Sequence, residues 1–281
     1  MSSDSLLGGI PENIQVPTYD DDKAAAYLCN WAYDYYNGIR VTKEYDGWTI
    51  CEDSFIRDKL GCKFRLVVKS SDFQSLLFTK QKNNGYTYYA YCTVGTNSLK
   101  DWFTANLLQG LIGLSPQYTR SVQNAKELHD FAIKHKAVLW FIGHSLGGGL
   151  ASNNSIITGR YAITFDAAGL NIMRVKMSLL MNIFYNNRAK VLFKYSERKE
   201  KIHAYILRGE ILNRIMQCFF EKAYGLKGDQ YIIRPQIKEI QNKSSRAKHD
   251  LDYLIKELEL YKSNDEYLKR VVYNNYERLT D

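Results

Sequence analysis

Cysteine and proline are scarce, since the 281 residues include only five cysteines and four prolines. The cysteines are scattered along the chain, and no two of them form a C-x-x-C pair. This spacing excludes a disulfide-rich scaffold and a cysteine-based zinc site, because both need clustered or regularly spaced cysteines. It fits synthesis in a reducing compartment.

Long apolar runs are also missing. No run approaches the roughly 18 apolar residues that a membrane-spanning helix requires. The first 15 residues contain neither a basic segment nor a continuous apolar segment, and a conventional secretion signal has both. We therefore expect no signal peptide of that kind and no transmembrane helix.

The composition is that of a basic globular protein. Apolar residues make up 45% of the chain and charged residues 24%, which is typical of a domain with a sizeable core. The formal net charge of +8 favours anionic partners such as lipid head groups, although a basic surface that only maintains solubility would give the same charge. No stretch resembles a basic recognition helix, so we expect no nucleic-acid partner.

The first third of the chain predicts an irregular arm, a helix and several strands. Residues 1–20 form the expected arm, and Asp20 to Asp22 are expected to cap a helix that runs to about Asn37. Weakly alternating residues predict a strand over 64–69. Two further strands over 73–80 and 86–94 flank an Asn-Gly turn, which indicates an antiparallel hairpin.

The most informative stretch lies in the middle of the chain. Residues 137–142 are all apolar and predict a buried parallel strand. They lead into Gly143-His144-Ser145-Leu146-Gly147, a match to G-x-S-x-G, and then into small residues that can begin a helix. In a strand–turn–helix context this motif is a nucleophile elbow, which lifts the serine hydroxyl above the sheet edge. Ser145 is therefore the predicted nucleophile.

Two further predicted strands follow the elbow. They cover 161–165 and 203–207, and each is followed by an acidic residue, Asp166 and Glu210 respectively. Strands that alternate with helices indicate a mostly parallel sheet flanked by helices. Because active groups gather at the carboxyl ends of such strands, we expect Ser145 and both acids at one edge of the sheet.

A serine hydroxyl needs a base, and the base needs an acid that holds its tautomer. In α/β-hydrolases the chain order is serine, acid, histidine. Two histidines follow Ser145: His203 falls inside an apolar strand, whereas His249 lies at a loop-to-helix junction after the last strand and is the predicted base. Glu210 is the preferred acid because it follows the later strand, and Asp166 is the main alternative. Asp229 and Asp250 rank behind them.

An oxyanion hole is expected beside the serine. The strand that ends at about Val94 leads into the loop Gly95-Thr96-Asn97. In a serine hydrolase of this architecture that loop supplies one N–H donor, and the residue after the nucleophile supplies the other. The candidates are Thr96 and Leu146, although the Thr96 loop taken alone also fits an ordinary polar turn.

The remaining segments suggest contact with lipid and a helical end. Residues 173–185 are apolar and methionine-rich, which fits either a core helix or a flap beside the site. The basic residues within 188–201 fit a solvated face or an anionic membrane surface. The charged segment from about 245 to 278 predicts an amphipathic helix that ends a single domain over 21–281.

Three motifs together resemble the class 3 lipases, in particular their bacterial phospholipase branch. They are YCTVGT at 91–96, GHSLGGGLA at 143–151 and TFDAAGL at 164–170. The resemblance implies an α/β-hydrolase fold and a metal-independent, cofactor-free serine esterase that acts on acyl glycerides or phospholipids at a membrane surface. It also implies that Thr96 and Leu146 frame the oxyanion hole.

Two positions depart from the family pattern. Val94 stands where the family commonly has arginine, and Glu210 stands where it commonly has aspartate. A phospholipase A or lipase remains the leading hypothesis. The alternatives are a catalytically inactive lipase-like domain that binds a membrane or a protein partner, and an acyltransferase on the same scaffold.

The resemblance also bears on where the protein acts. Related bacterial lipases include toxins that are exported by specialised secretion machines without a conventional signal peptide. For this chain the resemblance implies synthesis in a bacterial cytoplasm, export by such a machine, and an immunity protein in the producing cell.

Overall fold

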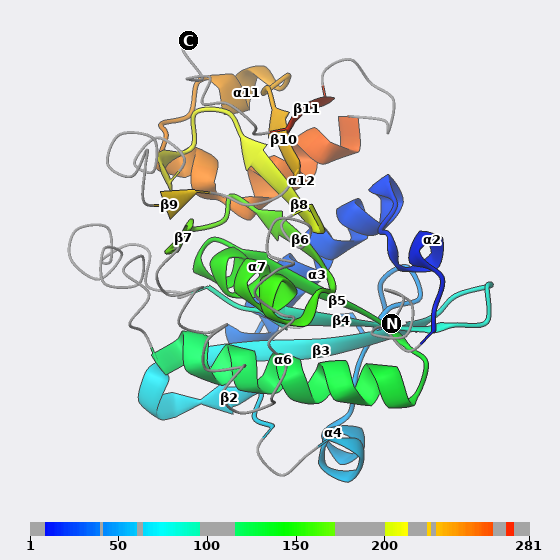
Figure 1. Cartoon of the computed structure of the whole chain (residues 1–281). Coiled ribbons are helices and arrows are strands. Elements are labelled where there is room, and N and C mark those ends of the chain that lie inside the picture. The colour runs from blue at the N-terminus through cyan, green and yellow to red at the C-terminus, as the bar shows by residue number, and fades with distance from the viewer. Residues whose placement is uncertain are drawn as a thin grey trace.

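The computed structural model describes residues 9–39, 42–60, 64–95, 116–171, 200–212, 224–225, 229–260 and 268–272. Within these ranges one mixed sheet forms the centre of the molecule, and helices lie against both of its faces (Figure 1). The mostly parallel α/β architecture expected from the sequence is confirmed.

The centre of the sheet is parallel. β4 (Thr87–Thr93), β5 (Val138–His144), β6 (Tyr161–Phe165), β8 (Ile202–Leu207) and β10 (Asp229–Ile233) lie side by side in this order, and each is parallel to the next. Every residue of β5, β6 and β8 is buried, as expected for parallel strands that are covered on both faces. The strands predicted on both sides of the serine motif are therefore confirmed.

Antiparallel strands extend both edges of the sheet. β3 (Phe73–Gln81) pairs with β4 in the predicted hairpin, and β1 (Thr49–Ile50) and β2 (Val67–Val68) pair with β3. At the other edge β11 (Leu268–Val272) pairs with β10. A separate two-stranded ribbon joins β7 (Leu170–Asn171) and β9 (Tyr224–Gly225).

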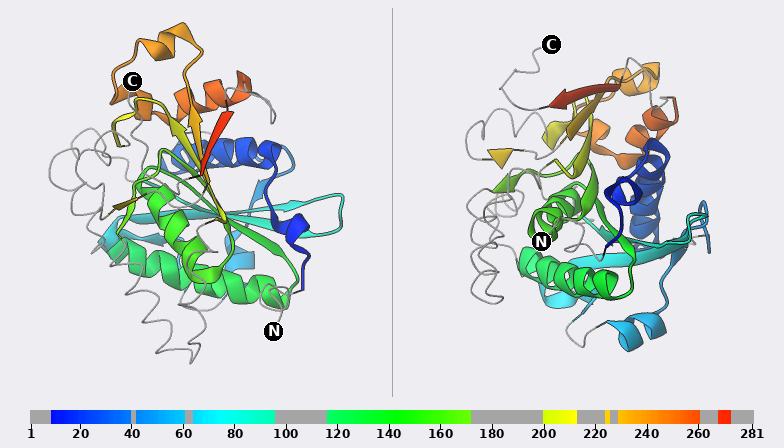
Figure 2. Two further views of the ribbon diagram at one scale, coloured as in Figure 1. Left: turned by 45° about the horizontal axis from the view of Figure 1, so that its top comes forward. Right: turned by 45° about the vertical axis from the view of Figure 1, so that its right-hand side comes forward.

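Two layers of helices cover the sheet, as Figure 2 shows. α6 (Pro116–Lys134) and α7 (Leu146–Thr158) pack together over one face, and α3 (Tyr19–Tyr36) and α12 (Leu251–Leu260) pack together over the other. Among the residues described, no helix is both long and apolar enough to cross a membrane. The shorter helices are α2 (Glu12–Gln15), η1 (Lys69–Ser71), α4 (Asp53–Lys59), α11 (Lys238–Gln241) and η3 (Ala247–His249).

Three sequence predictions about local structure are wrong. The predicted helix over about 245–278 is broken at Asp250, whose extended backbone separates η3 from α12, and Leu268–Val272 is a strand because it pairs with the edge of β10. The predicted strand at 64–69 is reduced to two residues. The arm at 1–20 contains α2, which is attached to the sheet because Trp140 Nε1 donates to the carbonyl of Gln15 at 2.7 Å.

The start of α3 also differs from the prediction. Its N-cap is Thr18, whose hydroxyl accepts from the amide of Asp21 while the Asp21 carboxylate accepts from the amide of Thr18. This capping box pairs two amides that would otherwise lack acceptors. The acidic residues at 20–22 therefore lie in the first turn, where they stabilise the positive end of the helix dipole.

Asp22 connects α3 to the middle of the sheet. Its buried carboxylate accepts from His203 Nδ1 at 2.9 Å and from the hydroxyl of Tyr205 at 2.7 Å, and both partners lie on β8. Burial and the neighbouring Asp22 carboxylate raise the pKa of Tyr205, so its hydroxyl remains a donor. His203 thus belongs to a helix–sheet contact, as its place in an apolar strand predicted.

Replacing Asp22 with alanine is expected to lower the free energy of unfolding by about 3–5 kcal/mol, because it leaves two buried polar groups without their shared acceptor. Urea denaturation followed by circular dichroism measures this change. The control is Asp20→Ala, which removes an exposed carboxylate in the same helical turn and should cost less than about 1 kcal/mol. Equal losses in the two variants would contradict the structural role of Asp22.

Candidate active site

Ser145 lies in the turn between β5 and α7 with strained backbone geometry. Its φ of 58° and ψ of −128° are rarely adopted by residues other than glycine. Three hydrogen bonds hold this conformation: its amide donates to the carbonyl of Phe165, and its carbonyl accepts from the amides of Gly149 and Ala168. The strand–turn–helix context that the elbow motif requires is therefore present.

Ser145, His249 and Glu210 form one line of hydrogen bonds. His249 Nε2 lies 2.9 Å from Ser145 Oγ, and His249 Nδ1 lies 2.9 Å from Glu210 Oε2. All three side chains are buried, with at most 3% of any residue exposed. Because an ionised carboxylate only accepts, Nδ1 carries the proton and the Nε2 lone pair faces the serine hydroxyl. The same Glu210 oxygen accepts from the amide of Leu212, which holds it in place.

These three residues come from distant parts of the chain. Ser145 follows β5, Glu210 follows β8 and His249 ends η3, so all three meet at the carboxyl edge of the parallel strands. The structure thus brings together the serine, histidine and preferred acid that the sequence singled out. The arrangement can remove the proton of the hydroxyl and stabilise the resulting imidazolium.

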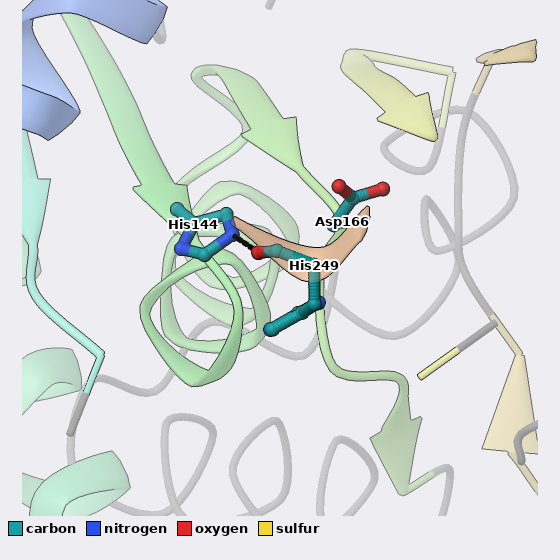
Figure 3. Close-up of side chains that lie close together, drawn as sticks. All are labelled: His144, Asp166 and His249. Carbon is teal, nitrogen blue, oxygen red and sulfur yellow. Dashed lines mark hydrogen bonds between the residues drawn. The ribbon is translucent and has the colours of Figure 1, made fainter. Parts of the chain in front are cut away.

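Asp166, the alternative acid, forms no hydrogen bond to either of the described histidines beside it, His144 and His249, and in Figure 3 its carboxyl group points away from the His249 ring. Asp166 Oδ1 accepts from the amide of Leu207 at 2.8 Å, and Oδ2 is buried and has no hydrogen-bond partner among the described residues. Burial, followed by the charge of Glu210, raises the pKa of Asp166 well above its usual value, against the opposing effect of the Leu207 amide. Its surroundings beside the line of hydrogen bonds therefore favour the neutral form of Asp166.

His144, Asp166 and His249 bring potential metal-ligating atoms within 4.8 Å of one another. The imidazole nitrogens are already engaged, however. Those of His249 contact Ser145 and Glu210, and those of His144 contact the Tyr33 hydroxyl and the carbonyl of His249. The ring nitrogens of His144 and His249 thus face protein groups and are not free to bind a metal in this arrangement.

One of the two predicted oxyanion donors is described. Leu146 is the first residue of α7, and the first amides of a helix have no acceptor within the helix. Thr96 lies outside the described residues. The glycine before it, Gly95, lies beside the nucleophile, since a Cβ built on it would be 3.5 Å from Ser145 Cβ. The loop that leads to Thr96 thus begins next to the serine.

The segments that the sequence linked to lipid contact lie only partly within the described residues. The methionine-rich segment 173–185 and the basic positions within 188–199 lie outside the described residues. Lys201, the last residue of that basic cluster, forms an ion pair with Glu12 at 2.8 Å. Val94, which stands at the family's arginine position, is buried at the end of β4.

Sequence reasoning missed two polar residues at the site. Tyr33 on α3 places its hydroxyl 3.2 Å from His144 Nδ1, and His144 Nε2 lies 3.0 Å from the carbonyl of His249. His144 is the residue before the serine, and a histidine at the end of an apolar strand was the available signal. No spacing in the sequence pairs it with Tyr33, which is 111 residues away.

The chain is similar to two known proteins and to one family model. A segment of 101 residues is 35% identical to an extracellular phospholipase A1 of Serratia liquefaciens; it covers 36% of this chain and 29% of that protein, so the match spans under a third of the relative. Lipase II from Rhizopus niveus has a TM-score of 0.44 at 11% identity, over 77% of this chain and 82% of that one. The family model for the Tle-like phospholipase domain matches residues 24–252. This match covers most of the chain and includes Ser145, Glu210 and His249, so the chain belongs to the Tle-like phospholipase family.

Proposed function

We propose that this protein is a serine-dependent carboxylic ester hydrolase that acts on lipids as a phospholipase A or lipase. The observation that carries the proposal is the buried line from Ser145 through His249 to Glu210 at a strained strand-to-helix turn. Membership of a phospholipase family and the partial match to a phospholipase A1 support a lipid ester as the substrate.

Acylation begins when His249 Nε2 takes the proton of Ser145 Oγ and the oxygen attacks the acyl carbonyl carbon. The amide of Leu146, together with Thr96, stabilises the oxyanion that forms. Collapse of the tetrahedral intermediate breaks the ester bond, and His249 gives its proton to the leaving alcohol oxygen. Glu210 holds the tautomer of His249 and stabilises the imidazolium.

Deacylation repeats these steps with water. His249 takes a proton from the water, whose oxygen attacks the acyl-enzyme carbonyl carbon. The intermediate collapses to a free fatty acid, and Ser145 Oγ recovers its proton from His249.

The test is fatty acid release from vesicles of phosphatidylglycerol and phosphatidylethanolamine and from a triglyceride emulsion, measured by mass spectrometry. Phospholipids with different acyl chains at the two glycerol positions identify the ester that is cut. Added acceptor alcohol distinguishes hydrolysis from acyl transfer, because transfer would yield a new ester. Absence of both products from all three lipids would overturn the proposal.

The acid is tested by two variants. Glu210→Gln is expected to lower kcat about 10²- to 10⁴-fold, because an amide no longer stabilises the imidazolium. Asp166→Asn should retain kcat within about threefold, since burial raises the pKa of Asp166 and favours its neutral form, which an amide resembles. Both are measured on a soluble nitrophenyl ester. A large loss of kcat in Asp166→Asn, with kcat retained in Glu210→Gln, would assign the acid to Asp166 instead.

We also propose that the enzyme is exported against other cells and is neutralised by an immunity protein in its producer. Support comes from the resemblance to bacterial lipases that include such toxins. Directed to the periplasm of a bacterial host, the wild type should stop growth while Ser145→Ala does not, and a neighbouring gene product should restore growth. Unimpaired growth with an active wild-type enzyme in the periplasm would contradict this role.

A further inference from the structure

A second line of hydrogen bonds reaches the site from α3. The hydroxyl of Tyr33 lies against Gly95, since a Cβ added to that glycine would be 2.6 Å from it, and it lies 3.2 Å from His144 Nδ1. His144 Nε2 in turn lies 3.0 Å from the backbone carbonyl of His249. This second line of hydrogen bonds, from Tyr33 through His144 to the His249 carbonyl, shares only the backbone of His249 with the line formed by Ser145, His249 and Glu210.

The direction of each bond follows from its end groups. A carbonyl oxygen only accepts, so His144 carries its proton on Nε2 and donates to His249. Nδ1 of the neutral ring is then an acceptor, and the Tyr33 hydroxyl must donate to it. Each of the two bonds in the second line therefore has one allowed direction.

A neutral His144 is also what the reaction requires. Its ring lies 4.8 Å from the His249 ring, which becomes positively charged during turnover. Burial, followed by the proximity of His249, lowers the pKa of His144 well below its usual value. A neutral neighbour avoids repulsion between two like charges in a site with little water.

We propose that Tyr33 and His144 are positioning residues that set the place of His249 and of Gly95 relative to Ser145. This proposal rests on the proposed hydrolase function and names two residues that act in it without touching the substrate. The second line begins at the Tyr33 hydroxyl, which lies against Gly95, and ends at the backbone of the base.

The consequence is that one phenol hydroxyl supports both sides of the nucleophile. On one side it packs against Gly95, the residue before Thr96, and on the other it holds, through His144, the segment that carries His249. Displacing a reacting group by about 1 Å can cost about 10²-fold in rate. Loss of the second line should therefore lower kcat more than it raises KM, because the substrate-binding surface is left in place.

The experiment compares variants that keep or remove the second line. Tyr33→Phe removes the hydroxyl, and His144→Met removes both bonds of the ring at similar volume. His144→Gln can restore both, because its amide oxygen accepts from Tyr33 and its amide nitrogen donates to His249. Tyr36→Phe is the matched control: Tyr36 also lies on α3 and donates to a backbone carbonyl, but that carbonyl, of Ser75 at 2.7 Å, belongs to neither line of hydrogen bonds.

We expect Tyr33→Phe and His144→Met to lower kcat on a soluble ester about 10-fold or more, with KM changed less than about twofold. His144→Gln should recover most of the loss. Tyr36→Phe should lower Tm without lowering kcat. The rate of fluorophosphonate labelling at Ser145 should fall in parallel with kcat.

Two outcomes would overturn the proposal. One is wild-type kcat in folded Tyr33→Phe, and the other is an equal loss of kcat in Tyr33→Phe and Tyr36→Phe, which would indicate a general effect on stability. Should His144→Met not fold, Tyr33→Phe against Tyr36→Phe decides the matter. Failure of the hydrolase function itself is recognised separately, because the wild type would then neither cleave esters nor react with the probe.

Discussion

Ser145→Ala is expected to lower kcat for ester hydrolysis by at least about 10³-fold and by up to about 10⁶-fold. The hydroxyl oxygen is the atom that becomes bonded to the acyl group, and no other group can take its place between His249 and the substrate carbonyl. Residual turnover would come from the oxyanion hole and substrate binding alone. The measurement is kcat on a soluble nitrophenyl ester, extended to phospholipid vesicles.

The fold of this variant should be intact, because the substitution removes one oxygen and leaves the backbone bonds of Ser145 in place. A matched control is Ser152→Ala, which removes a buried serine hydroxyl from α7 away from the site and should retain kcat. Turnover by purified Ser145→Ala at the level of Ser152→Ala would exclude Ser145 as the nucleophile.

Gly147→Ala is expected to prevent stable folding, with a loss of more than about 4 kcal/mol in the free energy of unfolding. A Cβ at this position would lie 2.0 Å from the carbonyl oxygen of Thr93 and 3.0 Å from the amide nitrogen of Gly95. Both are backbone atoms at the end of β4, so neither can turn aside as a side chain can. The close approach also carries a hydrogen bond from Thr93 Oγ1 to the Gly147 carbonyl at 2.7 Å.

Soluble yield and Tm measure this effect, and Gly38→Ala is the control. Gly38 has a φ of +71° but open space around its Cα, so alanine there should cost only about 1 kcal/mol through backbone strain. A Gly147→Ala protein with a Tm no lower than that of Gly38→Ala would show that β4 and α7 can separate without loss of the fold.

The elbow and its partners could be predicted because their signals are local or ordered along the chain. The apolar run before Gly143 predicts a strand, and G-x-S-x-G adds the turn and the helix that follow. The chain order of serine, acid and histidine then made Glu210 and Asp166 the leading acids to compare. Glu210 was preferred by its strand position, and its contact with His249 agrees with that choice.

Other features depend on contacts that a single sequence does not contain. Asp166 lies at the same sheet edge as Glu210. Its side chain is turned toward the Leu207 amide, whereas that of Glu210 contacts His249, and the sequence does not show this difference. Leu268–Val272 has a composition that fits a helix or a strand, and pairing with β10 decides it. The contact between Tyr33 and His144 joins a helix face to a strand end, and no periodic pattern in the sequence predicts such a pairing.

The most direct test of the proposed triad is mass spectrometric mapping of a fluorophosphonate adduct, since this probe reacts only with an activated serine. The triad predicts one adduct on Ser145 in the wild type, and none within the same time in His249→Ala, which lacks the base. An adduct on another serine, equal labelling of both proteins, or an unlabelled wild type would contradict the assignment of Ser145 and His249 as nucleophile and base.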